Sequence, residues 1–160
     1  MEAVTLRPMT EQDAAQVAAI ERACFTRPWS EQAFRKEAQT PSSHYFVACI
    51  GQDIIGFGGM QTVLDECSIT NIAILKDFRG KGIGSRLMEA LDTLAQQLGA
   101  SFLTLEVRVS NQPALALYEK FGFLPVGIRK NYYALPTEDA VLMTKTYPER
   151  GELQNENSCH

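Results

Sequence analysis

The chain has 160 residues, of which 45% are hydrophobic and 21% are charged, and its formal net charge is −4. This length suffices for one domain whose core needs neither metals nor disulfides, and the composition is typical of a soluble globular protein. The net acidity argues against a nucleic-acid partner, because phosphate backbones bind to concentrated basic surfaces. The amino terminus does not resemble a signal peptide, and no apolar run reaches the roughly 20 residues of a membrane-spanning helix. We therefore expect a cytoplasmic protein without membrane or nucleic-acid partners.

The cysteines and histidines give no sign of a metal site. The cysteines show no CxxC or other metal-like spacing: Cys24, Cys49, Cys67 and Cys159. Cys49 and Cys67 lie in apolar, strand-like runs, where a free cysteine behaves as a small hydrophobic residue. We favour buried, reduced cysteines over a disulfide or a catalytic role, which fits a reducing compartment. His44 and His160 form no ligand cluster, so no metal is expected.

The first part of the chain predicts a strand and a helix. We expect residues 4–7 to form a short strand. Thr10 followed by Asp13 resembles a capping arrangement at a helix start. The positions after it recur with helical spacing: Ala14, Val17, Ala18, Ile20, Glu21 and Cys24.

A second, shorter helix is predicted after a break at residues 25–30. Ser30 is a good N-cap for a helix that ends at about residue 38. Trp29 precedes this cap and could pack on Phe34 one turn later as a hydrophobic staple. Trp29 could instead contact a ligand, and we favour the staple because its spacing fits that motif.

Three extended runs come next, at residues 45–50, 54–63 and 67–74. The segments between them are short enough for antiparallel hairpins. Glycines within the middle run predict a bulge or a close backbone approach: Gly56, Gly58 and Gly59.

The second half predicts a helix, a strand, a helix and two strands. An apolar stripe begins at Ile83 and ends before Gly99, and residues 102–107 form a strand too continuously apolar for a sheet edge. Asn111 is a plausible N-cap for a helix that runs to residue 121. Residues 124–133 and 140–146 are the last expected strands. The order β-α-α-β-β-β-α-β-α-β-β, with a single βαβ crossover, indicates an α/β (α+β) fold with a mixed sheet.

A glycine turn, residues 79–84 (RGKGIG), leads into the apolar-striped helix. Unpaired backbone N–H groups at a helix start, together with the helix dipole, attract anions, and Arg79 and Lys81 add mobile positive charge. The glycines could equally serve only tight strand-to-helix packing, and these residues alone leave both interpretations open. A Walker loop is excluded because Lys81 is followed by Gly82, and a dinucleotide fingerprint because the spacing is G-x-G-x-G after about the fourth strand.

Two further residues could carry chemistry. Glu106 is a charge within an apolar strand, where carboxylates are rare unless paired or functional. Arg108 shares its face of the strand and could simply pair with it, so a structural and a catalytic role both remain open. Tyr118, on the helix after Asn111, would by itself pass for a core aromatic with a satisfied hydroxyl.

Together these motifs resemble the GCN5-related N-acetyltransferase (GNAT) superfamily. The glycine turn is similar to its motif [RQ]-x-x-G-x-[GA], carried by Arg79, Gly82 and Gly84. Other segments are similar to the ribosomal-protein-alanine N-acetyltransferase (RimI-type) subgroup: PWS at 28–30, NIAI at 71–74, LEVRVSN at 105–111, ALYE at 116–119, GF at 122–123, RKNYY at 129–133 and EDA at 138–140. The resemblance implies a GNAT fold over residues 1–147, with about seven strands flanked by about four helices. The polar residues 148–160 fall outside it, and we expect them to be a disordered tail.

The resemblance also implies roles for particular residues. The cosubstrate would be acetyl-CoA, with Glu106 as general base and Tyr118 as general acid. It implies that the remaining site residues bind the cofactor: Ile72, Ala73, Ile74, Arg79, Gly80, Lys81, Gly82, Ile83, Gly84, Ser85 and Asn111. The implied reaction acetylates the N-terminal alanine of a protein, ribosomal protein S18 being the first candidate. Lysine or small-amine acetylation, or a CoA-binding module without catalysis, are the alternatives.

Overall fold

A computed structural model describes residues 3–148, so the expected tail lies outside the described residues from position 149 onward. The sequence suggested one domain over residues 1–147. The structure groups the chain into two compact units, Met1–Thr62 with Ile69–Thr93, and Val63–Ser68 with Leu94–His160. We name them unit 1 and unit 2. The chain therefore enters unit 2 twice, at Val63 and at Leu94.

Unit 1 holds three helices and most of four strands. The elements, including those that continue into unit 2, are β1 (Thr5–Pro8), α1 (Ala14–Cys24), α2 (Glu31–Gln39), β2 (Ser43–Ile50), β3 (Asp53–Val63), β4 (Glu66–Ile74) and α3 (Ile83–Gln97). β1 pairs antiparallel with β2, and β2 with β3. The predicted order of elements is confirmed.

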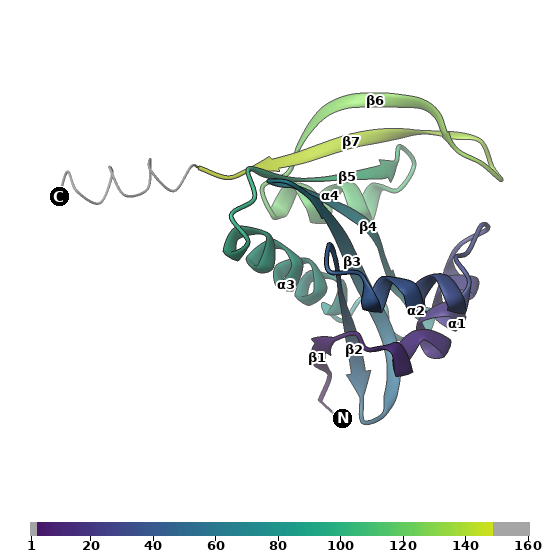
Figure 1. Cartoon of the computed structure of the whole chain (residues 1–160). Helices are drawn as coiled ribbons and strands as arrows, with labels where there is room; N and C mark the ends of the chain where they lie inside the picture. The colour runs from purple at the N-terminus through teal and green to yellow at the C-terminus, as the bar shows by residue number, and fades with distance from the viewer. Residues whose placement is uncertain (1–2, 149–160) are drawn as a thin grey trace, which may run out of the picture. The chain divides into compact units, whose positions relative to one another are not determined.

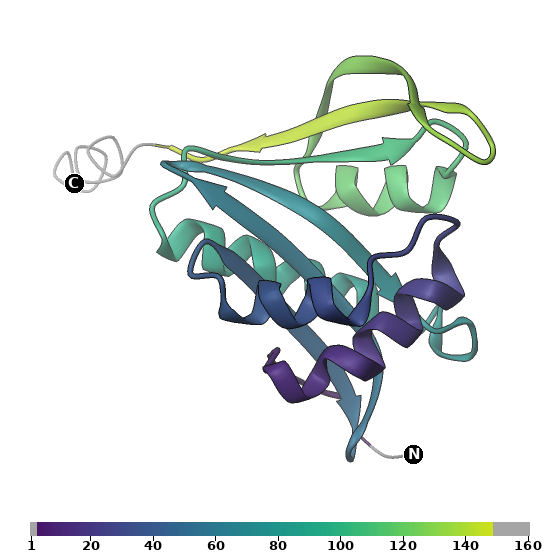
Figure 2. The ribbon, with the colours of Figure 1, turned by 45° about the vertical axis from the view of Figure 1, so that its right-hand side comes forward.

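The two faces of these strands bury different helices, as strand alternation requires. Val47 and Cys49 of β2 join a core with residues of α1 and α2, whereas Ala48 packs with Ile83 and Leu87 of α3. Figure 1 and Figure 2 show α1 and α2 in front of these strands and α3 behind them. Unit 1 is therefore a three-layered α/β arrangement.

The glycines of β3 allow a close approach, as predicted. A Cβ at Gly59 would overlap the ring of Tyr45. The β2–β3 register is irregular at Ala48 and Cys49, opposite Gly56, so both a bulge and a close contact are present. Gly59 therefore leaves the space that the Tyr45 ring occupies against the neighbouring strand.

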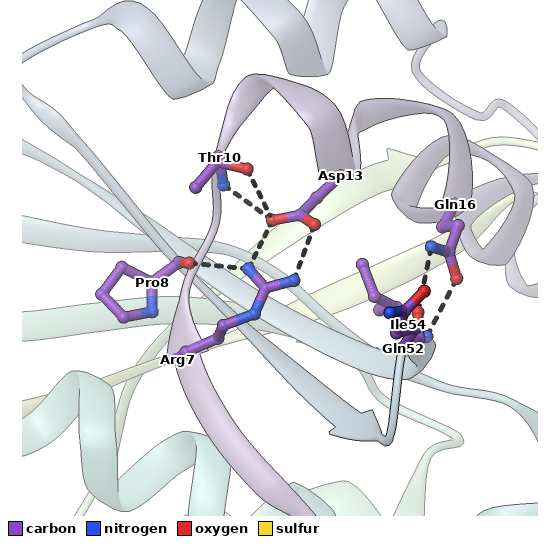
Figure 3. A network of polar contacts seen from close by, with 7 residues as sticks. All are labelled: Arg7, Pro8, Thr10, Asp13, Gln16, Gln52 and Ile54. Carbon is purple, nitrogen blue, oxygen red and sulfur yellow. Dashed lines mark hydrogen bonds and ion pairs between the residues drawn. The ribbon is translucent and has the colours of Figure 1, made fainter.

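An ion pair fixes the start of α1 (Figure 3). Arg7 donates from Nη1 and Nη2 to the two oxygens of Asp13, at 2.7 and 2.8 Å. The backbone N–H of Thr10 donates to Asp13 Oδ2 at 2.7 Å, so the predicted capping arrangement is confirmed. The sequence did not indicate Arg7 as a partner, although it lies only six residues away.

Unit 2 holds β5 (Phe102–Arg108), α4 (Gln112–Lys120), β6 (Leu124–Tyr133) and β7 (Glu138–Thr146). The first residues of β4 pair parallel with β5, and β7 pairs antiparallel with both β5 and β6. The described strands follow the order β1-β2-β3-β4-β5-β7-β6. This confirms a mixed sheet of seven strands with four α-helices, with β5 inside the sheet and β6 at its exposed edge. No helix within residues 3–148 is long and apolar enough to cross a membrane.

Candidate active site

The backbone conformation of the glycine turn requires glycine at two positions. Gly80 and Gly82 have φ values of 77° and 81°, a region that residues with a Cβ rarely adopt. A Cβ at either position would meet nothing within 4 Å, so tight packing does not explain them. This removes the packing interpretation for these two positions.

The turn presents the head of α3. The N–H of Arg86 donates to the carbonyl of Gly82 at 3.1 Å, which places Gly82 at the N-cap. The N–H groups of Ile83, Gly84 and Ser85 therefore fall in the first helical turn, where no intrahelical acceptor is available to them. The Ile83 side chain is buried and anchors this turn in the core. The geometry suits an anion.

Arg79 is fixed, contrary to our expectation of a mobile charge. Its Nε–H donates to the carbonyl of Ile74 at 2.9 Å, and its Nη2 lies 3.5 Å from Cys24 Sγ. Arg79 thus connects the glycine turn to the end of β4. Lys81 lies 5.7 Å from the centre of the Phe78 ring.

The end of β4 keeps its side chains in the core. Ala73 is buried against the α1 and α2 side, while Ile72 and Ile74 pack on the α3 side. Contacts from this segment to a ligand would therefore come from its backbone. Just upstream, the Thr70 hydroxyl lies 3.0 Å from the Tyr45 hydroxyl, and Asn71 Nδ2 donates to Glu21 Oε1 at 2.6 Å.

The sequence interpretation missed a role for Glu21, which is only 3% exposed. Its Oε1 accepts from Asn71 Nδ2 at 2.6 Å, and its Oε2 accepts from the backbone N–H of Trp29 at 2.8 Å. Burial raises the pKa of this carboxyl group. The sequence did contain a signal for this role, because Glu21 is an acidic residue within the apolar stripe of α1.

Glu106 lies in unit 2, on β5 between the buried residues Leu105 and Val107, with its side chain 22% exposed. Its partner is Arg129 of β6, whose Nε lies 3.1 Å from Glu106 Oε1. The pairing with Arg108 that the sequence left open is wrong. Residues two apart on a strand stand nearly 7 Å apart, whereas a long side chain on another strand can reach across diagonally.

Arg108 instead fixes the turn between β6 and β7. Its guanidinium donates to the carbonyls of Pro136 at 3.0 Å and Ala134 at 3.3 Å. It also stacks on the ring of Tyr133, 4.4 Å from the centroid, and lies 3.8 Å from Glu138 Oε1. Arg108 therefore has a structural role next to the candidate base.

Tyr118 and Asn111 belong to α4 and its cap. The Tyr118 ring packs on Phe123 with centroids 5.9 Å apart, and burial raises the pKa of its hydroxyl to about 12. Asn111 is the predicted N-cap, because its side-chain oxygen accepts from the N–H of Ala114 at 3.2 Å. The structure thus places Glu106, Asn111 and Tyr118 in unit 2, and the glycine turn and the end of β4 in unit 1.

The cysteine prediction holds where it can be checked. Cys24, Cys49 and Cys67 are free, and the last two are buried, while Cys159 lies outside the described residues. Among residues 3–148, no group of three or more His, Cys, Asp or Glu side chains could hold a metal ion.

Comparison with known proteins identifies the family. Residues 14–123 match the Acetyltransferase (GNAT) family. The chain belongs to the GNAT family. A protein of Bacillus subtilis (strain 168) is 42% identical over 145 residues, which are 90% of this chain and 96% of the relative. The [ribosomal protein bS18]-alanine N-acetyltransferase of Escherichia coli (strain K12) is 39% identical over 130 residues, or 78% of this chain and 84% of the relative.

Solved structures of the GNAT family agree with the fold. The crystal structure of the ribosomal-protein-S18-alanine N-acetyltransferase from Escherichia coli superposes with a TM-score of 0.86 at 34% identity. The match covers 94% of this chain and 97% of that one. The likeness therefore spans the strands and helices of both units.

Proposed function

We propose that this GNAT protein is an acetyl-CoA-dependent N-alpha-acetyltransferase that acetylates the N-terminal alanine of a protein, with ribosomal protein S18 as its substrate. The observation that carries the proposal is the whole-length match to an enzyme of this activity, rather than a match to the cofactor-binding segments alone. Such a substrate places the enzyme in the cytoplasm.

Acetyl-CoA would be held by unit 1. The N–H groups at the head of α3 and the charge of Lys81 suit the pyrophosphate, while Arg79 keeps the turn in place through Ile74. The backbone at Ile72–Ile74 would meet the pantetheine arm and the thioester. The family resemblance implies that Asn111 is a further cofactor ligand.

The chemistry is direct transfer. The α-amino group, with a pKa near 7.7–8.0, loses a proton to Glu106 directly or through water, and its nitrogen attacks the thioester carbonyl. A backbone N–H near Ile74 would stabilise the tetrahedral oxyanion. The C–S bond then breaks, and the departing thiolate takes the proton of Tyr118. The acylated nitrogen still carries one proton more than the amide, and this proton returns to the tyrosinate through solvent. The raised pKa of Tyr118, about 12, keeps its hydroxyl protonated near neutral pH, so the proton is available to the thiolate.

The test uses purified protein, acetyl-CoA and three acceptors: an Ala-starting peptide, the same peptide with a blocked amino terminus and an internal lysine, and spermidine. We expect turnover on the first. Lysine, with a pKa near 10.4, would need a stronger base. Turnover on the blocked peptide or on spermidine, with none on the free peptide, would overturn the proposal.

A further inference from the structure

Two of the arginine–carboxylate pairs within residues 3–148 differ in build, Arg7–Asp13 and Arg129–Glu106. Arg7 grips Asp13 with both terminal nitrogens, and the Asp13 side chain is 7% exposed. Arg129 Nε lies 3.1 Å from Glu106 Oε1, and the Glu106 side chain is 22% exposed. Bidentate pairs are the strong and geometrically specific ones, whereas a one-point contact is weaker. The Arg129 pair is therefore the more easily replaced.

The two residues of the Glu106–Arg129 pair lie on different kinds of strand. Glu106 projects from β5, inside the sheet, whereas Arg129 projects from the edge strand β6 with its side chain 53% exposed. The measured strength of ion pairs with such exposure is small. Arg129 can therefore leave Glu106 at low cost, while Glu106 cannot move away from the strand that holds it.

The other polar side chains near Glu106 do not supply it with a positive charge. Arg108 is engaged by the turn carbonyls of Ala134 and Pro136 and by the Tyr133 ring. Burial is the main reason that the pKa of the Tyr132 and Tyr133 hydroxyls is raised, and the nearby charge of Glu106 raises both further. Both hydroxyls therefore stay neutral. Arg129 is thus the cation that contacts the carboxylate.

The proposed reaction brings a second cation to the same carboxylate. An N-terminal amine with a pKa of 7.7–8.0 arrives largely as an ammonium ion at neutral pH. Glu106 must accept its proton, and the guanidinium already occupies Oε1. Two cations held at one carboxylate repel each other, so the arriving ammonium group weakens the contact of Arg129 with Glu106.

On the basis of the proposed function, we infer that Arg129 is an exchangeable counter-ion of Glu106, which the ammonium group of the acceptor peptide displaces. Arg129 keeps the carboxylate paired while no acceptor is bound. Displacement frees Glu106 to take a proton only when an amine stands in front of it. Arg129 is then a competitor of the substrate and not one of its ligands.

The test measures peptide dissociation constants in the presence of CoA, which supports binding without turnover. The ligands are the Ala-starting peptide and its Nα-acetylated form. Arg129→Ala and Arg129→Gln should bind the free-amine peptide about two- to fivefold more tightly, in line with the modest strength of exposed ion pairs, and the acetylated peptide as the wild type does. Arg129→Lys keeps the charge and should bind both as the wild type does. Lys130→Ala, which removes the neighbouring exposed cation, is the matched control and should change neither.

A double-mutant cycle completes the test. In a Glu106→Gln background, Arg129→Ala should no longer tighten binding of the free-amine peptide, because the carboxylate for which Arg129 and the ammonium group compete is absent. Weaker binding of both peptides by Arg129→Ala would make Arg129 a peptide ligand, and unchanged binding would show no competition; either result overturns the inference. Turnover of the wild type on the free-amine peptide is measured alongside. Its absence would refute the proposed function, whereas its presence with unchanged binding refutes only the exchange.

Discussion

Asn71 Nδ2 donates a 2.6 Å hydrogen bond to Glu21 Oε1, which joins β4 to α1 across 50 residues of sequence. The second oxygen of Glu21 holds the N–H of Trp29 in the connection from α1 to α2. A carboxyl group that is almost completely buried therefore connects three segments just before the stretch proposed to meet acetyl-CoA.

Glu21→Ala should lower the free energy of unfolding by about 1–3 kcal/mol, because it removes the buried acceptor of the hydrogen bonds from Asn71 and Trp29. Urea denaturation measures the change. Glu89→Ala, which removes an exposed glutamate from α3, is the control and should stay within about 0.5 kcal/mol of the wild type. Equal stability of the two variants would contradict the buried network.

Asp13 makes stability sensitive to acid. Hydrogen bonds from Arg7 are the main reason that the pKa of Asp13 lies below its ordinary value of 3.8. A depressed carboxyl pKa contributes stability above the unfolded-state value, and this stability is lost as the pH falls through the folded-state pKa. Asp13→Asn should therefore be less stable than the wild type near neutral pH, with a gap that closes in acid. Denaturation across pH measures the gap, and a constant gap would refute the linkage.

Gly82→Ala should weaken acetyl-CoA binding and lower stability by about 1–2 kcal/mol, because alanine is strained at positive φ. Gly51, in the β2–β3 turn, also has a positive φ of 60° and provides the strain control. Gly51→Ala should lose similar stability with no change in acetyl-CoA affinity by calorimetry. Equal loss of affinity in both variants would mean that strain alone is responsible.

Glu106→Gln should lower turnover by about 10²–10⁴, the usual contribution of a general base, with little change in acetyl-CoA affinity. Steady-state kinetics and calorimetry measure the two quantities. Glu119→Gln, at an exposed position of α4, should leave both as in the wild type. Turnover of Glu106→Gln at the wild-type rate would remove Glu106 from the mechanism.

Tyr118→Phe should lower kcat by about 10²–10⁴, nearer the smaller value, because a hydroxyl with a pKa of about 12 is a weaker acid than an ordinary thiol near 8.5. The ring contact with Phe123 is kept, so stability should change little. Since the hydroxyl stays protonated below its pKa, the ratio of wild-type to variant kcat should be constant from about pH 7 to about pH 10. A ratio that falls over this range would argue against proton donation by Tyr118.

Local chemistry made several features predictable from sequence. Ser30 caps α2 by accepting from Ala33 N–H at 3.1 Å, and Trp29 packs on Phe34 with ring centroids 5.6 Å apart. These features depend on side chains a few residues apart, whose relative positions a helix fixes. The order of helices and strands along the chain also followed from hydrophobic patterns, whose period differs between the two kinds of element.

Long-range partners were not predictable in the same way. The Glu106–Arg129 pair depends on how β6 and β7 align, and that register shifts between Arg129 and Tyr133. The Glu21–Asn71 bond depends on how β4 lies against α1, which is 50 residues away in sequence. Both are set by pairing between distant segments, about which sequence periodicity carries no information.

Asn111 caps α4 with its side-chain oxygen, which accepts from the N–H of Ala114, while the cap does not use its NH₂ group. A bound molecule that meets this NH₂ group must offer a lone pair, as phosphate or carbonyl oxygens do. Aspartate here would still cap the helix but would repel an anion. The polarity of a cap therefore selects which end of a ligand can approach it.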